Sequence, residues 1–522
     1  MMKHSVFTLL FTLALSCLSN AQKTPNILFI AVDDLNTNLG CYGDGFAISP
    51  NIDRLAKMGT VFGNNHCQQA ICGPSRASIM TGLRQDTLKI WEFGQRMREI
   101  NPDTITLPQF FKEKGYETTC IGKIYDFRNV NGENDPESWS IPSKTFEDYH
   151  FHPDYQKPVN GHYQSPHSKK LFEEAKSQGL KDYFSISKYM KEHDGMPAVE
   201  CMEEELPDNS YTDGAIALAA TELLKQLNQG GKPFFLGVGF NKPHLPFAAP
   251  KKYWNMYDRK DISIHPFQKR SSNPVLRAYH SSGELKSYSG IPKFNSYSDH
   301  TDNHLPLDQQ KELIHGYYAC VSFVDAQVGK LLDTLEDQGI VDNTVVVLWG
   351  DHGFHLGDHG LWHKHTNFEQ ATRSPLIISA PNIASKQISA APTEFIDVFP
   401  TLCELAGLVP LPRLEGKSLV PLMKGGMTSV KPFALSQYPR GKDVMGYSIR
   451  TENYRYTEWI KGGWRTFKSY DPKLVIGREL YDYQKDPMEK FNIWQQTEKQ
   501  EVLKKMQTHL HQFFAKDQTQ IE

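Results

Sequence analysis

Carboxylates, lysines and histidines directly follow four short apolar runs of the chain. The runs and the residues after them are 26–32 before Asp33 and Asp34, 117–122 before Lys123, 232–240 before Lys242 and His244, and 344–349 before Asp351 and His352. Three carboxylates and an imidazole brought to one point repel each other unless a cation neutralises them. Oxygen-rich ligand sets favour calcium or magnesium over zinc. The strand ends therefore predict a site for a divalent cation.

A second reactive group lies in the segment CGPSRASIMTG at residues 72–82. Proline suits the first turn of a helix, so Pro74 predicts a helix from Pro74 to Met80 with Cys72 just before its N-terminus. Backbone N–H groups there favour an anion beside the cysteine. The residues alone allow a half-buried structural thiol, or a thiolate nucleophile with His66 as its base. Neither alternative explains the cation site.

The elements that must position these side chains are strands of one sheet. The continuous apolar run 26–32 is typical of a strand covered on both faces. Short apolar runs alternate with helical patterns at 213–227 and 308–338, which predicts an α/β fold with a mostly parallel sheet. Ligands bind at the carboxyl ends of such strands. The long regions 126–207 and 257–303 are rich in polar and aromatic residues, and we expect them to wall a substrate cleft.

Composition excludes several classes of protein. The 522 residues carry 57 Lys and Arg against 60 Asp and Glu, a net charge of −3. Without a strong basic field, the chain is not expected to bind nucleic acid. No cysteine belongs to a CxxC pair, which excludes zinc ribbons and thioredoxin-like sites. Cys120 and Cys320 lie in apolar segments, so we expect buried free thiols there.

The N-terminal segment predicts export. Residues 1–21 combine a basic start, a short apolar run and a small-residue end, as in a cleavable signal peptide, with cleavage expected after Ala21. We therefore expect a secreted or periplasmic protein. Lipoprotein anchoring through Cys17 is the less favoured alternative, and no later segment is apolar enough for an integral membrane helix.

The segment Cys72-Gly73-Pro74-Ser75-Arg76, completed by Thr81-Gly82, resembles the signature of the type I sulfatases, in which this cysteine is oxidised to formylglycine. VDD at 32–34, GK at 122–123, KPH at 242–244 and DHG at 351–353 stand in that family's order. Stretches such as NKPHLPF and DHGFHLGDHG are most similar to its iduronate-2-sulfatase branch, and the resemblance covers most of the chain.

The resemblance implies an alkaline-phosphatase-like fold and a set of residue roles. It implies a large mixed, mostly parallel sheet flanked by helices in residues 22–411, and a smaller C-terminal α+β domain in 412–522. The implied roles are calcium ligation by Asp33, Asp34, Asp351, His352 and the modified Cys72, orientation of the hydrated aldehyde by Arg76, sulfate binding by Lys123 and Lys364, and contact with the leaving alcohol by His244.

Formylglycine explains why a cysteine is needed. The resemblance implies that one hydroxyl of the hydrated aldehyde attacks sulfur and displaces the alcohol. The other hydroxyl then expels sulfate by reforming the carbonyl, whereas a plain serine or cysteine would remain as a stable ester. Such chemistry requires a formylglycine-generating maturase as a partner.

One position departs from the iduronate-2-sulfatase branch. Asp126 stands where that branch has a histidine. It could act as a base or bind a sugar hydroxyl, and we expect it to alter specificity rather than abolish activity. Trp362, His363 and Arg440 are further candidates for contact with the sugar.

These observations predict an enzyme that hydrolyses sulfate esters of a sulfated saccharide, in polysaccharide or glycosaminoglycan degradation. One alternative is a phosphatase or phosphodiesterase of the same fold. Such enzymes usually need a two-metal site with a Ser or Thr nucleophile, so Cys72 argues against that class. The other alternative is an inactive paralogue that binds polysaccharide, which only Asp126 favours.

Overall fold

A seven-stranded sheet forms the centre of the protein in the computed structural model, which describes residues 24–296, 304–383, 386–463, 465 and 470–519. Its strand order is β11-β2-β10-β7-β1-β5-β3. The bounds are β1 Asn26–Val32, β2 Thr60–His66, β3 Glu117–Gly122, β5 Phe234–Phe240, β7 Thr344–Gly350, β10 Leu376–Ser379 and β11 Gln387–Glu394. Only β10 pairs antiparallel with its neighbours among these strands. The predicted mixed, mostly parallel sheet is confirmed.

The register of the sheet brings the predicted strand ends together. Val32 at the end of β1 pairs with Phe240 of β5 on one side and with Gly350 of β7 on the other. Gly122 at the end of β3 pairs with Gly239. The residues that follow β1, β3, β5 and β7 therefore emerge at one edge, as expected for parallel strands.

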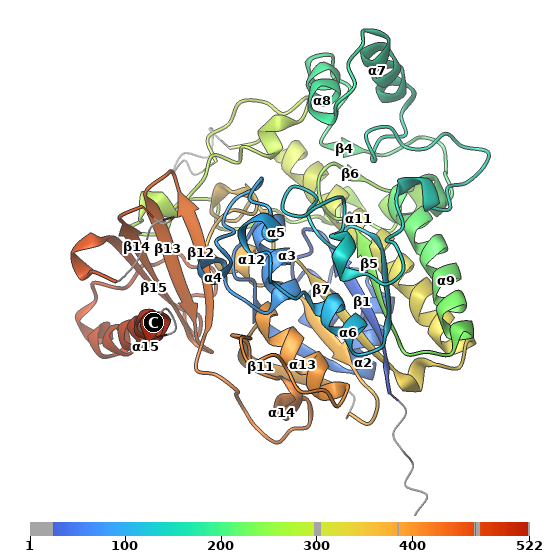
Figure 1. Ribbon diagram of the computed structural model, residues 1–522. Coiled ribbons are helices and arrows are strands. Elements are labelled where there is room, and N and C mark those ends of the chain that lie inside the picture. Colours follow the sequence, from blue (N-terminus) through green and yellow to red (C-terminus); the bar gives the residue numbers. More distant parts are fainter. Residues whose placement is uncertain (1–23, 297–303, 384–385, 464, 466–469, 520–522) are drawn as a thin grey trace, which may run out of the picture.

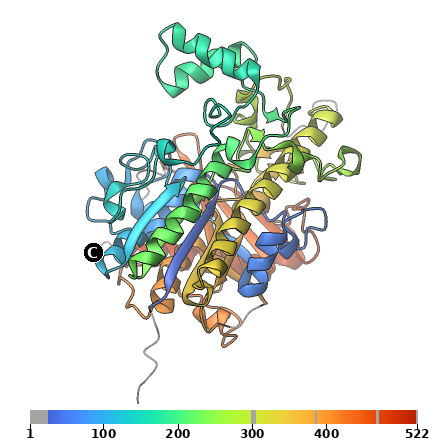
Figure 2. The ribbon, with the colours of Figure 1, turned by 90° about the vertical axis from the view of Figure 1, so that its right-hand side faces the viewer.

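Helices cover both faces of the sheet because β1 is apolar on both. Leu28, Ile30 and Val32 belong to one core cluster, and Ile27 and Phe29 belong to another. Figure 2 shows α9 (Thr212–Gly230) and α11 (Leu307–Asp337) lying across one face. The opposite face packs against α3 (Cys72–Thr81), α6 (Leu107–Glu113) and α13 (Val398–Leu405).

One local prediction needs correction, and one region holds helices that the sequence did not suggest. The helix expected from Pro74 begins two residues earlier, so Cys72 is the first residue of α3 and Ile71 precedes the helix in an extended conformation. The region 126–207 contains α7 (Pro166–Ser177) and α8 (Tyr183–Glu192), which project from the body in Figure 1. Ser165 and Asp182 cap the N-termini of these helices, because their side chains accept hydrogen bonds from backbone N–H groups. Such caps indicate helix starts, but they are hard to recognise in a region this rich in polar residues.

The C-terminal part forms a second, antiparallel sheet beside the main one (Figure 1). Its strands are β12 Ala434–Arg440, β13 Val444–Arg450, β14 Tyr454–Lys461 and β15 Val475–Asp482, and helix α15 (Gln500–Thr519) packs against it. The smaller α+β unit is thus present as predicted. The boundary at residues 411 and 412 stays a prediction.

The cysteines agree with the sequence where the structure describes them. The seven cysteines of the described part are unpaired, and Cys120 and Cys320 are buried as expected. No helix within the described ranges is long and apolar enough to cross a membrane. The predicted signal peptide at 1–21 and the candidate lipidation site Cys17 lie outside the described residues.

Glu479 in β15 predicts a pH-dependent stability. It is 2% exposed and accepts hydrogen bonds from Trp459 Nε1 at 2.7 Å and from the Tyr481 hydroxyl at 2.9 Å. Burial raises its pKa from 4.5 to about 7. The protonated form therefore stabilises the fold fully below pH 4.5, and this contribution, roughly 3 kcal/mol, is lost as pH rises through about 7.

Replacing Glu479 with glutamine removes the cost of burying an ionised carboxylate at high pH. We expect Glu479→Gln to unfold about 1–3 °C above the wild type near pH ~8.5, and to lose this advantage near pH ~5. Thermal unfolding followed by circular dichroism at both pH values measures the difference. Glu452→Gln, at an exposed position, is the matched control and should leave the midpoint unchanged. A Glu479→Gln midpoint below the wild type at both pH values would contradict the argument.

Candidate active site

Three buried carboxylates meet at the strand ends. Asp33 and Asp34 follow β1, Asp351 follows β7, and each is at most 1% exposed. The backbone N–H of Asp34 donates to Asp351 Oδ1 at 3.0 Å. Arg76 of α3 joins the other two, with Nη2 2.9 Å from Asp33 Oδ1 and Nε 3.0 Å from Asp351 Oδ2. The fully buried guanidinium thus fixes the distance between the carboxyl ends of β1 and β7.

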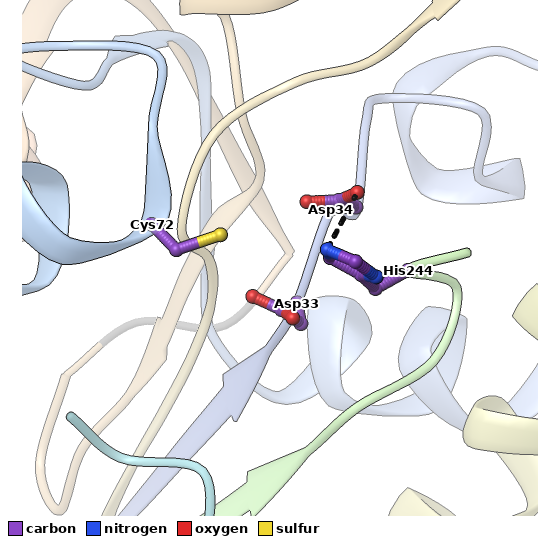
Figure 3. A group of neighbouring side chains, drawn as sticks. All are labelled: Asp33, Asp34, Cys72 and His244. Atoms are coloured by element: carbon purple, nitrogen blue, oxygen red, sulfur yellow. Dashed lines mark ion pairs between the residues drawn. The ribbon is translucent and has the colours of Figure 1, made fainter. Parts of the chain in front are cut away.

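Cys72 and His352 complete this group from two other directions. The Cys72 sulfur lies 3.4 Å from His352 Nε2, and Figure 3 shows it pointing toward Asp33 and Asp34. His352 Nδ1 donates to the carbonyl of Gly353 at 3.0 Å, which turns Nε2 toward the carboxylates. That nitrogen lies 3.4 Å from Asp34 Oδ1 and 3.6 Å from Asp351 Oδ1.

This donor set fits a divalent cation. Carboxylate oxygens and an imidazole nitrogen gathered at one buried point favour a positive charge between them. Cys72 with Asp33 and Asp34, and Cys72 with Asp351 and His352, place their ligand atoms within 4.8 Å of one another. Burial raises the pKa of the Cys72 thiol well above its usual range, and Asp33 adds to the effect. The unmodified side chain is therefore a neutral thiol.

Two lysines lie against the same carboxylates. Lys123 Nζ is 2.6 Å from Asp33 Oδ2, and Lys364 Nζ is 2.9 Å from Asp34 Oδ2. Burial disfavours the charge on Lys123, but Asp33 overcomes it and raises the pKa. Both ammonium groups therefore stay positive. Because they lie beside Cys72, they would attract an anionic group of a substrate to that position.

His244 faces this group from the loop after β5, as Figure 3 shows. Its Nδ1 donates to the carbonyl of Leu245 at 2.5 Å, while Nε2 lies 3.9 Å from Asp34 Oδ2 and 3.1 Å from Glu284 Oε1. Burial lowers its pKa, yet Asp34 and Glu284 raise it by more, so the net shift is upward. His244 is therefore suited to carry a proton.

Glu284 is a site residue that the sequence analysis missed. It comes from the long region 257–303, and Oε1 also accepts from Lys364 Nζ at 2.7 Å. The region was expected only to wall the cleft. No strand, motif or apolar pattern adjoins Glu284, so the sequence carried no signal for it.

Asp126 is held by a neighbour instead of facing the pocket freely. It is 2% exposed, and Arg128 Nε and Nη2 donate to its two oxygens at 2.8 and 2.6 Å. Burial disfavours its charge, but Arg128 lowers its pKa below the usual range. The Arg128 guanidinium lies 3.4 Å from the centre of the Phe93 ring. Cys72 and Asp33 help to raise the pKa of Arg128, which places its charge near the pocket.

The remaining candidates occupy different environments. Trp362 is 3% exposed within the core, and Arg440 donates to the backbone carbonyls of Arg277, Ala278 and His365. These contacts brace the C-terminal sheet against the main body. His66 is also engaged, with its ring nitrogens 2.9 Å from Asn64 Oδ1 and 3.2 Å from Thr372 Oγ1. His363 is buried beside Glu284, with 3.6 Å between Nδ1 and Oε2.

The chain is similar to known sulfatases over most of its length. The family model described as sulfatase matches residues 25–408, and the model for the C-terminal part of N-sulphoglucosamine sulphohydrolase matches 357–516. Iduronate 2-sulfatase of Homo sapiens is 31% identical over 531 residues, covering 90% of this chain and 91% of that protein.

Solved structures share the fold. A complex with the substrate D-glucosamine-2-N,6-O-disulfate has a TM-score of 0.70 at 20% identity, covering 95% of this chain and 99% of the other. The phosphonate monoester hydrolase of Agrobacterium radiobacter has a TM-score of 0.66 at 22% identity, covering 94% and 96%. With the alkaline-phosphatase-like fold in place and the family match spanning the whole main sheet, the chain belongs to the sulfatase family of sulfuric ester hydrolases.

Proposed function

We propose that the protein hydrolyses sulfate esters of a sulfated saccharide, using Cys72 matured to formylglycine and a bound calcium ion. The observation that carries the proposal is the convergence on Cys72 of three buried carboxylates, His352 and two lysines. A cation, two ammonium groups and a proton donor around one nucleophilic position match the charge that develops when a sulfate ester is cleaved.

Each side chain has one task in this proposal. Asp33, Asp34, Asp351 and His352 hold calcium, which supplies positive charge to sulfate oxygens when bound. Arg76 orients the hydrated aldehyde, and its contacts with Asp33 and Asp351 also hold these two carboxylates in place. Lys123 and Lys364 bind sulfate oxygens, and His244 protonates the departing alcohol from Nε2. Formylglycine at position 72 supplies a hydrated aldehyde as the nucleophile.

The relatives and the N-terminal segment support the proposed substrate and location. Iduronate 2-sulfatase acts, by its name, on a sulfated uronic acid, and the solved complex contains a disulfated glucosamine. We therefore propose a sulfated oligosaccharide or polysaccharide as substrate. Export to the periplasm or beyond, with formylglycine installed by a maturase, agrees with residues 1–21.

Sulfate release from defined substrates tests the function. The full chain is produced with a formylglycine-generating maturase, and the peptide that contains residue 72 is checked by mass spectrometry. Sulfated uronate, hexosamine and algal oligosaccharides are then screened beside phosphate and phosphonate monoesters. We expect sulfate release from at least one saccharide. Turnover of the phosphonate alone would favour a phosphonate hydrolase, and no turnover with confirmed aldehyde would favour a binding protein.

Asp126 positions Arg128 toward an anionic group of the substrate in this proposal. We expect Asp126→Asn to raise KM about tenfold to a hundredfold, the range for losing a charge-assisted hydrogen bond, and to change kcat less than about threefold. Steady-state kinetics on the best saccharide measures both.

A double-mutant cycle supplies the control for Asp126. Arg128→Gln should reproduce the rise in KM, and the double variant should add little to either single change because both act through one contact. A large fall in kcat for Asp126→Asn alone, with KM unchanged, would instead identify Asp126 as a base.

A further inference from the structure

Glu284 presents its two oxygens to two different environments. Oε1 accepts from Lys364 and lies near His244, whereas Oε2 points to the other side, 3.6 Å from His363 Nδ1. Oε2 has no hydrogen-bond partner among the described residues. One ligand atom from each of Glu284, His363 and His365 lies within 4.8 Å of the others. Three donor atoms thus converge on a point next to the candidate active site.

The two imidazoles at this point lack the partners that buried polar groups usually have. His363 is 2% exposed, and neither of its ring nitrogens has a hydrogen-bond partner in the part of the chain that the structure describes. The same is true of Nε2 of His365. Buried polar atoms are ordinarily paired, so such orphan nitrogens call for a ligand. Burial lowers the pKa of His363 to about 3 and that of His365 well below its usual range. Both rings are therefore neutral and offer lone pairs.

His280 supports the arrangement without joining it. Its ring stacks on His363 with 4.1 Å between the centres and 24° between the planes. The backbone N–H of Ser282 donates to His280 Nδ1 at 2.9 Å, so the proton of the neutral ring is on Nε2. A protonated nitrogen cannot bind a metal. His280 therefore fixes the orientation of the His363 ring.

We propose that Glu284, His363 and His365 form a second metal site, suited to Zn²⁺ and separate from the calcium ligands. Two imidazoles and one carboxylate are a ligand set that zinc uses, with a coordination position left open. Calcium prefers oxygen ligands, so the two sites select different ions. The site depends on these three residues alone, whether or not the protein is an active sulfatase.

Metal content and anomalous scattering test the site directly. The full chain is saturated with calcium chloride, equilibrated with zinc chloride, and assayed for bound zinc and calcium. We expect one zinc per chain and an anomalous peak at the zinc edge between Glu284, His363 and His365. His363→Ala should weaken zinc binding by about a hundredfold or more, since even neighbours of metal ligands contribute about 10- to 100-fold. An unchanged circular dichroism spectrum shows that the variant is folded.

His280→Phe is the matched control, because it keeps the aromatic stack and removes the nitrogens. It should retain zinc affinity within about fivefold, and a loss as large as that of His363→Ala would overturn the assigned ligands. The proposal also fails if zinc appears only among Asp33, Asp34 and Asp351, or if His363→Ala binds zinc like the wild type. Neither measurement uses enzyme activity, so an inactive protein leaves the result interpretable.

Discussion

Replacing Cys72 with alanine is expected to abolish sulfate release, with a loss of about 10⁴-fold or more. Cys72 is the first residue of α3. Its side chain is 1% exposed and is surrounded by Asp33, His352, Lys123 and Lys364. No other nucleophile in the described residues occupies that point. Removal of a covalent nucleophile typically leaves only the catalysis that binding and electrostatics provide.

The same reasoning makes the unmodified protein inactive. Burial and Asp33 raise the pKa of the Cys72 thiol, so it does not supply a thiolate near neutral pH. Chain produced without the maturase should therefore resemble Cys72→Ala in sulfate release. Mass spectrometry of the peptide spanning residue 72 relates the fraction of aldehyde to the specific activity, and the two should rise in proportion.

Cys67 provides the matched control. It is a buried thiol five positions earlier, and its sulfur contacts only the carbonyl of Ala371 among the hydrogen bonds described. Cys67→Ala should lower the unfolding temperature and leave kcat on the best saccharide within about threefold. Full activity of a protein whose Cys72 is shown to be an intact thiol would refute the proposed chemistry.

Replacing His244 with alanine is expected to lower kcat on a sugar sulfate by about 10²–10⁴-fold, the usual contribution of a general acid. A sugar alkoxide is a poor leaving group and needs a proton, which His244 Nε2 is placed to give. A nitrophenyl sulfate leaves as a stable phenolate and needs none. The loss on the aryl ester should therefore be less than about tenfold.

The pH profile separates this role from simple binding. Burial lowers the pKa of His244, but Asp34 and Glu284 raise it above its ordinary value of 6.5. The acid form is active, so wild-type kcat on the sugar sulfate should fall as pH rises through a point above 6.5. His244→Ala should lack this fall. His167→Ala, on an exposed turn of α7, should leave both substrates and the profile unchanged. Equal losses on both substrates would exclude proton donation.

Much of the candidate site could be predicted because the signal lay in regular elements. An apolar run with charged residues after it predicts a buried parallel strand and a ligand edge, and β1, β3, β5 and β7 follow that pattern. The sulfatase motif could be read because its residues are consecutive along one helix. Its start was placed two residues late because Pro74 fits the third helical position as well as the first.

The contacts of individual side chains could not be predicted in the same way. Trp362 and Arg440 were expected to contact the sugar, but one lies in the core and the other binds backbone carbonyls. We therefore propose no sugar contact for either. The type of a side chain indicated what chemistry it could perform. The direction in which the side chain points depended on packing against segments distant in sequence.

By itself, the sequence determined the parallel sheet, because strand and helix periodicity depend on near neighbours. It also indicated the sulfatase family and the residues around Cys72, because short consecutive motifs resemble those of that family. Only the tertiary structure decided that Glu284 reaches Lys364 and His244, that Arg128 holds Asp126, and that His363 and His365 converge. These contacts join the region 257–303 and the residues after β7 and β3 across the sheet edge. The contacts of Glu284 depend on how distant segments of the chain pack together, and no local pattern encodes them.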